Sequence, residues 1–225
     1  MKINVALKQQ VTIAAGRPLR GQLAISRILP ATNARTLENP AVIKASKLSA
    51  LPVIVRTRRA YFDCKFGQLH VRTAFPTTGG FDELVTLFCL HPTEASSRTF
   101  SGILPQLADV RSVYAPDLPG YGESDSSPGR SIPDAAIAIS DLANDLRLRQ
   151  IDLMGVQYGA EVALELAAAR PELVRRLVLA GPPSAERLSV AKQQRLLVDA
   201  AACGDHPFDA VPAALARQIS AFLRS

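Results

Sequence analysis

Residues 151–159, with the sequence IDLMGVQYG, decide how this chain folds. A largely apolar run ends in a turn flanked by two glycines, and an alanine-rich stretch, residues 160–169, follows directly. The apolar run predicts a buried strand, and the alanine-rich stretch predicts a helix that ends near Pro171. A strand, a tight turn and a helix in this order are typical of a parallel sheet covered by helices.

The alternation of strands and helices continues on both sides of this stretch. We predict further strands at residues 60–66, 69–75, 84–90, 111–116, 176–180 and 196–201. We predict further helices at residues 97–107, 132–148, 185–194 and 210–223. Because only Gly67 and Gln68 separate the first two strands, these should form an antiparallel hairpin. The predicted fold class is therefore α/β, with a mixed, mostly parallel sheet and helices on both faces.

Charge is divided unevenly along the chain. The 225 residues carry a formal net charge of +6, yet residues 1–60 hold eleven Lys and Arg and a single acid, Glu38. All twelve Phe and Tyr residues lie at or after Tyr61. A basic segment without aromatic side chains is a poor core builder. We therefore expect residues 1–59 to form a loosely structured extension and residues 60–225 to form the folded domain.

The basic extension leaves several roles open: a targeting segment, a basic interaction arm or an ordered extra element. Since it has no aromatic platform for base stacking, we expect no nucleic-acid binding. No apolar run approaches the ~18 residues of a membrane span, and no convincing export signal is visible, so we expect no membrane contact and a cytoplasmic location. Three scattered cysteines and three scattered histidines predict no disulfide framework, no metal site and no cofactor.

The residues that follow each predicted strand are the candidates for a functional site, because ligands of such sheets bind at the carboxyl ends of the strands. Four segments qualify: residues 91–93 (HPT), 117–125 (DLPGYGESD), 155–159 (GVQYG) and 204–206 (GDH). Within the second of them, Asp117 is expected to hold the backbone amides of its own loop.

With these segments in this order, residues 60–225 resemble the α/β-hydrolase fold. The 117–125 run is similar to the loop that follows the fourth strand in many cofactor-independent esterases, dehalogenases and epoxide hydrolases. Residues 155–159 stand where that family has its G-x-S-x-G nucleophile elbow, and residues 204–206 with the helix after them resemble its histidine loop. The resemblance implies a hydrolase that acts on a small ester-like or related substrate.

Two features depart from the family pattern. Gln157 stands at the nucleophile position, and a carboxamide is not a nucleophile at neutral pH. His206 follows it by only 49 residues, where the resemblance implies a lid domain and a strand that bears the triad acid. We therefore expect a sheet that lacks the lid and one late strand. The open edge left by that strand could pair with another chain and produce an oligomer.

The resemblance assigns further roles residue by residue. His206 corresponds to the catalytic histidine and is expected to be the relic of a general base. The backbone N–H groups of Tyr158 and Thr93 are the candidates for an oxyanion hole, because the proline after His91 has no N–H to donate. His91 and Ser124 are expected to lie at the pocket.

Three interpretations of function follow from the sequence. The chain is a family member that hydrolyses a small substrate by a route without a serine, or a pseudoenzyme that binds a small ligand or a protein partner through the former pocket, or a shortened product that folds poorly. The missing nucleophile and the missing acid make efficient esterase activity unexpected, since loss of triad members leaves only about 10³–10⁴-fold catalysis over water.

Overall fold

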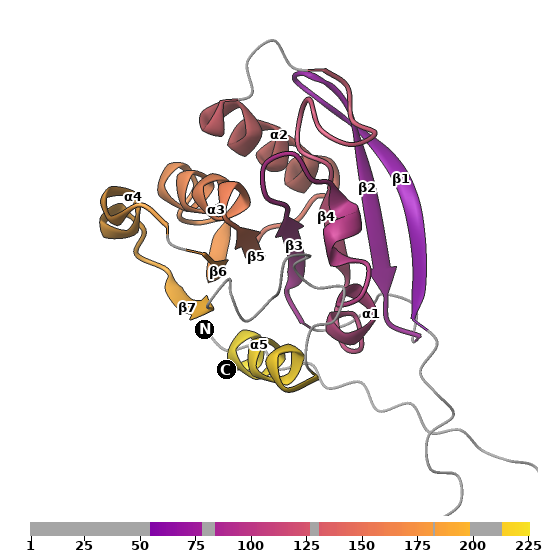
Figure 1. Ribbon diagram of the computed structural model, residues 1–225, viewed down its shortest axis with the longest axis vertical. Coiled ribbons are helices and arrows are strands. Elements are labelled where there is room, and N and C mark those ends of the chain that lie inside the picture. The colour runs from indigo at the N-terminus through magenta and orange to yellow at the C-terminus, as the bar shows by residue number, and fades with distance from the viewer. Residues whose placement is uncertain (1–54, 78–83, 127–130, 182, 199–212) are drawn as a thin grey trace, which may run out of the picture. The chain divides into compact units, whose positions relative to one another are not determined.

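A computed structural model describes residues 55–77, 84–126, 131–181, 183–198 and 213–225. These residues form one sheet of seven strands (Figure 1). The strands are β1 (Arg56–Cys64), β2 (Gly67–Phe75), β3 (Thr86–Leu90), β4 (Val113–Pro116), β5 (Ile151–Val156), β6 (Val174–Ala180) and β7 (Gln194–Val198).

The order of the strands in the sheet is β1-β2-β4-β3-β5-β6-β7. β1 and β2 form the predicted antiparallel hairpin, β2 is also antiparallel to β4, and the remaining neighbours are parallel. The chain reverses its direction of travel across the sheet at β3, which lies between β4 and β5. The carboxyl ends of β3 and β5 therefore meet at the place where open α/β sheets bind their ligands.

Side chains of the central strands alternate between two apolar cores. Phe88 and Leu90 of β3 belong to one cluster, and Leu87 and Cys89 belong to the other. β6 divides its side chains in the same way. Because both faces are covered, these strands are apolar at almost every position rather than at every second one.

Helices cover both faces of the sheet (Figure 1). α2 (Ile132–Asp145) and α3 (Tyr158–Ala169) contribute to the first core. The 3₁₀ helix η2 (Ser97–Phe100), α1 (Leu104–Leu107) and α5 (Ala213–Arg224) contribute to the second. α4 (Ala185–Val190) contacts α3. The mixed, mostly parallel sheet with helices on both faces is confirmed.

Several element boundaries differ from the prediction, and two of these differences have a clear physical reason. The helix predicted at residues 97–107 is two short helices, because Pro105 cannot donate the hydrogen bond that would continue η2 and instead lies in the first turn of α1. β1 begins at Arg56, four residues before the predicted strand. Its arginine-rich start is compatible with a strand at the edge of the sheet, where charged side chains remain in water.

A short link joins β6 to β7. Residues 181–193 are the whole of it, and their described part contains only the six residues of α4 before β7 pairs with β6. The described link therefore holds neither a lid domain nor an additional strand, as predicted. β7 is the last strand of the sheet that the described residues form, and Leu197 on it is exposed.

A buried ion cluster lies at the amino end of β5. The fully buried carboxylate of Asp152 accepts hydrogen bonds from Arg111 Nη1 (2.9 Å) and from Nε and Nη2 of Arg175 (2.9 and 2.7 Å). Arg175 also donates to the carbonyl oxygen of Leu223 in α5 (2.7 Å). The cluster thus connects β5, β6, the segment before β4 and the last helix. The burial of Asp152 and Arg111 is tolerated because their charges are paired.

Removing the central charge of this cluster should destabilise the domain. We expect Asp152→Asn to lower the free energy of unfolding by about 3–5 kcal/mol, because the buried guanidinium of Arg111 loses its counter-charge. Urea unfolding followed by circular dichroism measures the change. Asp145→Asn, at an exposed position near the end of α2, removes the same charge and should change stability by less than about 0.5 kcal/mol. Similar losses in both variants would contradict the role given to the cluster.

Candidate functional site

Gln157 occupies the tight turn between β5 and α3. Its backbone has φ 48° and ψ −109°, a conformation that glycine adopts readily and other residues rarely do. Its N–H donates to the carbonyl of Ala180 at the end of β6 (2.8 Å), and its carbonyl accepts the N–H of Ala160 (2.9 Å). The side chain is exposed. This strained turn from strand to helix is the geometry of a nucleophile elbow, and it carries a carboxamide.

Two glycines allow the turn to approach its neighbours. A Cβ atom on Gly159 would lie 2.1 Å from the carbonyl oxygen of Leu90, at the end of β3, and one on Gly155 would lie 2.3 Å from the carbonyl oxygen of Gly159. Both obstacles are backbone atoms, which cannot rotate away as a side chain can. The glycines on either side of Gln157 are therefore required by packing, whatever chemistry the residue between them performs.

The strain at Gln157 predicts an unusual stabilising substitution. Backbone strain of this kind costs about 1–3 kcal/mol, whereas a glycine loses about 0.5–1 kcal/mol through chain entropy. We expect Gln157→Gly to raise the free energy of unfolding by about 1 kcal/mol, measured by urea unfolding. Gln157→Ser keeps a Cβ atom and should leave stability nearly unchanged. A destabilised glycine variant would argue against a strained turn.

His91 follows β3 and is fully buried. Its Nε2 accepts the backbone N–H of Leu118 (2.9 Å), so the ring is neutral and its Nδ1–H donates to the carbonyl of Pro92 (2.8 Å). Burial lowers the pKa of the ring, although the bond to Pro92 opposes this. Since both nitrogens are engaged, His91 connects the loop after β3 to the loop after β4.

Aromatic contacts bring three loops together beside the elbow. The ring of Tyr121, in the loop after β4, lies 5.4 Å from the ring of His91 and 6.0 Å from the ring of Tyr158, both measured between centroids. Tyr158 is the first residue of α3 and directly follows Gln157. The structure thus gathers His91, Gln157 and Tyr158 at the carboxyl ends of β3 and β5.

Asp117, at the end of β4, is the centre of a buried hydrogen-bond network. Its carboxylate accepts hydrogen bonds from the backbone N–H of Glu123 (2.8 Å), the backbone N–H of Ser97 (2.5 Å) and the Nδ1–H of His70 (2.9 Å). Burial raises the pKa of this carboxyl, but the hydrogen bonds outweigh burial and hold the pKa below its usual value. The bond to Glu123 confirms that Asp117 holds an amide of its own loop, and the bond to Ser97 extends the network to η2.

A family model described as alpha/beta hydrolase fold matches residues 85–225. The chain belongs to the α/β-hydrolase fold family. It is 34% identical over 116 residues to the 2-hydroxymuconate semialdehyde hydrolase of Pseudomonas sp. (strain CF600), an alignment that covers 49% of this chain and 40% of that protein. It is also 29% identical over 141 residues to the pimeloyl-[acyl-carrier protein] methyl ester esterase of Neisseria meningitidis. This alignment covers 63% of this chain and 48% of the esterase.

Solved hydrolases share the fold. The haloalkane dehalogenase DbeA from Bradyrhizobium elkani superposes with a TM-score of 0.50 and 27% identity, over 56% of this chain and 42% of the dehalogenase. The epoxide hydrolase CorEH superposes with a TM-score of 0.51 and 24% identity, over 56% and 42% of the two chains. This α/β-hydrolase chain therefore matches less than half the length of each of these four relatives.

Three further site residues were expected in this α/β-hydrolase domain, and two of them, Ser124 and Thr93, are among the described residues. Ser124 accepts the backbone N–H of His70 (2.9 Å) and donates to the carbonyl of Asp117 (2.7 Å), so its hydroxyl fastens the loop after β4 to β2. Thr93 is exposed in the turn that follows His91. His206 lies outside the described residues.

Sequence reasoning did not single out His70. This histidine is buried on β2, its Nε2 lies 3.8 Å from the carboxylate of Glu123, and its ring lies 5.4 Å from that of Tyr61. The alternation in residues 69–75 carried a signal, because it places His70 on the strand face opposite Leu69. Its partner, Asp117, is 47 residues away, and that pairing is visible only once β2 and β4 are neighbours.

The described part of this α/β-hydrolase domain contains neither a metal-binding group nor a membrane-spanning helix. No three His, Cys, Asp or Glu side chains among the described residues form a group suited to a metal ion. No helix among them has the length and apolar character needed to cross a membrane.

The Asp117 network should make stability depend on pH. Because the pKa of the folded carboxyl is lower than the value of about 3.9 in an unfolded chain, its stabilisation is fully present above pH ~4 and is lost as the pH falls through the folded pKa. We expect Asp117→Asn to cost about 2–4 kcal/mol at pH 7. The difference from wild type should shrink between pH 4 and pH 3 in urea unfolding.

Asp109→Asn provides the matched control, since Asp109 is exposed just after α1. It should follow the wild-type pH profile. A cost for Asp117→Asn that is the same at pH 3 as at pH 7 would show that the carboxylate form of Asp117 does not stabilise the fold.

Proposed function

We propose that this protein binds a small molecule beside the elbow without performing covalent hydrolysis. One observation carries the proposal: Gln157 stands at the apex of a turn with elbow geometry. The covalent route needs a Ser, Cys or Asp side chain that forms and then breaks a bond to the substrate. A carboxamide does not do this at neutral pH, so the intermediate on which the covalent route depends would not form.

The surroundings of the elbow support a binding role. Gln157 is exposed at the carboxyl end of β5, and its amide can both donate and accept a hydrogen bond. Tyr158, the first residue of α3, adds an aromatic ring beside this amide. These groups favour a small polar ligand with a carbonyl oxygen, and the names of the relatives, which include a semialdehyde hydrolase and a methyl ester esterase, agree with such a ligand class.

A second candidate is slow hydrolysis of a small ester-like substrate by water. His206 would act as the general base, and the amide of Gln157 would orient the water. Retention of the strained turn and the hydrolase names of the relatives favour this candidate. For either candidate, we further propose a cytoplasmic location and no nucleic-acid partner. We also propose that two copies of the chain can pair through the edge strand β7.

Short-chain p-nitrophenyl esters separate the two candidates. We expect the wild-type protein and its His206→Ala variant to release p-nitrophenol at the same background rate, because neither contains a nucleophile at residue 157. Wild-type turnover that disappears in His206→Ala would contradict the binding proposal and support the water route.

The binding itself needs a readout other than turnover. Methyl butyrate, a small ester, should produce saturable chemical-shift changes in the backbone amides of residues 157–160, and Gln157→Ala should weaken them. Gln106→Ala, which removes an exposed carboxamide from α1, serves as the matched control and should leave the changes in place. The absence of saturable changes at the elbow in the wild-type protein would contradict the binding proposal.

A further inference from the structure

A hollow of about 330 Å³ lies between the β1–β2 hairpin and the segment that contains η2 and α1. Its lining consists of Thr57, Arg58, Arg59, Arg72, Ser101 and Leu104. In the sheet order, β4 and β3 separate this hairpin from β5, which carries the elbow. The hollow is therefore distinct from the site beside Gln157.

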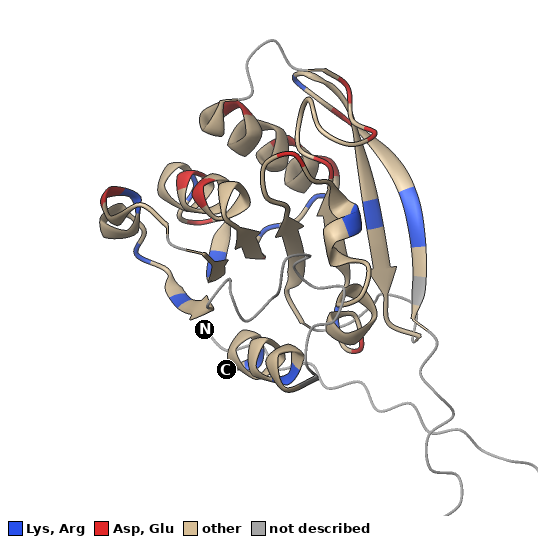
Figure 2. Cartoon of the chain, in the orientation of Figure 1, with Lys and Arg blue, Asp and Glu red and all other residues tan. Residues whose placement is uncertain are grey.

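Two of the lining arginines face each other across the hairpin. Arg59 and Arg72 are direct partners in the antiparallel register, and Figure 2 shows basic segments of β1 and β2 side by side. Side chains at such positions project from the same face with Cβ atoms about 4.5–5.5 Å apart, and two like charges there destabilise the sheet. The hairpin therefore places two positive charges together at a cost to its own stability.

Of the two arginines, Arg72 has fewer partners for its positive charge. It is half-buried, and its Nε is buried without a hydrogen-bond partner among the described residues. Burial lowers the pKa of Arg72, and the charges of Arg59 and Arg98 lower it further, whereas Asp117 and Glu123 oppose the shift. The guanidinium thus lies in a positive environment with an unused donor.

The nearby carboxylates are engaged elsewhere. Glu123 accepts a hydrogen bond from Arg98 (3.2 Å) and lies 3.8 Å from Arg59. Asp117 is bound by His70 and by backbone amides. Within the described residues Arg72 forms no ion pair, and the charges of Asp117 and Glu123 act on it without direct contact.

We propose that this hollow binds the phosphate group of a small molecule, held by Arg72 and Arg59. The guanidinium of arginine presents parallel N–H donors that match the oxygens of a phosphate. The hydroxyl-bearing residues Thr57 and Ser101 line the same hollow, and Leu104 supplies an apolar wall for an attached organic group. A bound phosphate would relieve the repulsion between the two facing arginines.

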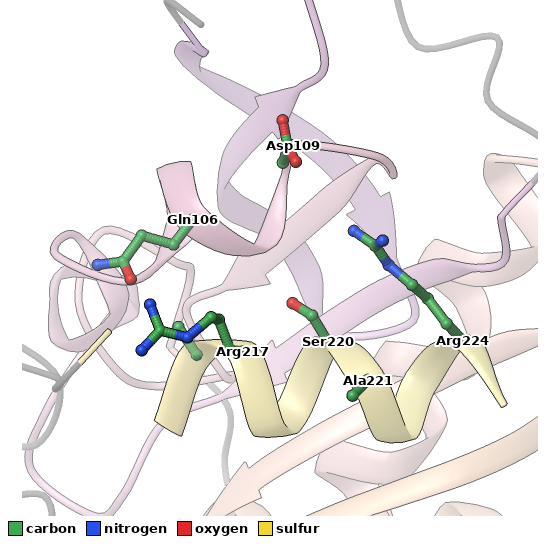
Figure 3. A pocket seen from close by; sticks show the side chains of 7 residues that line it. Gln106, Asp109, Arg217, Ser220, Ala221 and Arg224 are labelled. Atoms are coloured by element: carbon green, nitrogen blue, oxygen red, sulfur yellow. The ribbon is translucent and has the colours of Figure 1, made fainter. Parts of the chain in front are cut away.

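A second hollow with arginines provides a comparison. It measures about 390 Å³ and lies between α1 and α5 (Figure 3). There Arg217 and Arg224 lie on the same helix with Ser220 between them, and Arg217 extends toward Gln106 rather than toward Arg224. The lining also includes the acidic residue Asp109. Because its arginines do not converge, Arg217→Met is a matched control that removes one positive charge.

Thermal unfolding of the full chain tests the proposal. Inorganic phosphate, added at constant ionic strength with potassium chloride, should raise the Tm of the wild-type protein in a saturable manner. Arg72→Met should weaken the apparent affinity about tenfold or more, and Arg59→Met, at an exposed position, should also weaken it. Arg217→Met should respond like wild type. Without phosphate, Arg72→Met should unfold at the same temperature as wild type or higher, since a like-charge contact is removed.

Three results would overturn the proposal. The Tm of the wild-type protein could fail to rise in a saturable manner with phosphate, or the Tm of Arg72→Met and of Arg59→Met could rise as much as that of wild type. The third such result is a Tm of Arg217→Met that no longer responds to phosphate. Phenyl phosphate distinguishes the source of the phosphate. Tighter binding of phenyl phosphate than of inorganic phosphate would support a phosphorylated small molecule as the ligand. Binding of inorganic phosphate alone would overturn that part of the proposal, because the organic group would then have no place in the hollow.

Discussion

The contact between the turn at Gln157 and the end of β3 is the constraint on which the centre of this structure depends. Gly159 lies so close to the carbonyl oxygen of Leu90 that no residue with a Cβ atom fits at this position. This approach fixes where α3 begins, and α3 in turn fills the core on one face of β5 and β6. It also sets His91 beside the same turn, so that three loops share one aromatic contact group.

Polar contacts then fasten the two ends of the sheet in different ways. At the amino end of β5, the carboxylate of Asp152 joins two guanidinium groups from segments on either side. At the carboxyl end of β4, the carboxylate of Asp117 collects backbone amides from a loop and from η2, and a histidine from β2. The acid at Asp152 thus pairs buried side-chain charges, whereas the acid at Asp117 supplies backbone N–H groups with an acceptor where a strand ends.

The fold was predictable from the sequence because its signals are local. The glycine spacing at residues 155–159 and the apolar run of residues 84–90 each report on a few consecutive positions. The partnership of His70 with Asp117 and the facing pair of Arg59 and Arg72 depend on which strands become neighbours, and on their register, and no local pattern contains that information. The division of residues 97–107 into two helices was within reach, because Pro105 was visible in the sequence.

The thirteen-residue link between β6 and β7 has a consequence for the electrostatics at the elbow. Enzymes that close over a substrate expel water, and hydrogen bonds and charges inside the closed site act in a medium of low dielectric constant. Gln157 is exposed, so a dipole or charge placed near it interacts through water and is screened by dissolved salt. Polar contacts between Gln157 and a ligand at this end of the sheet would therefore weaken as the salt concentration rises.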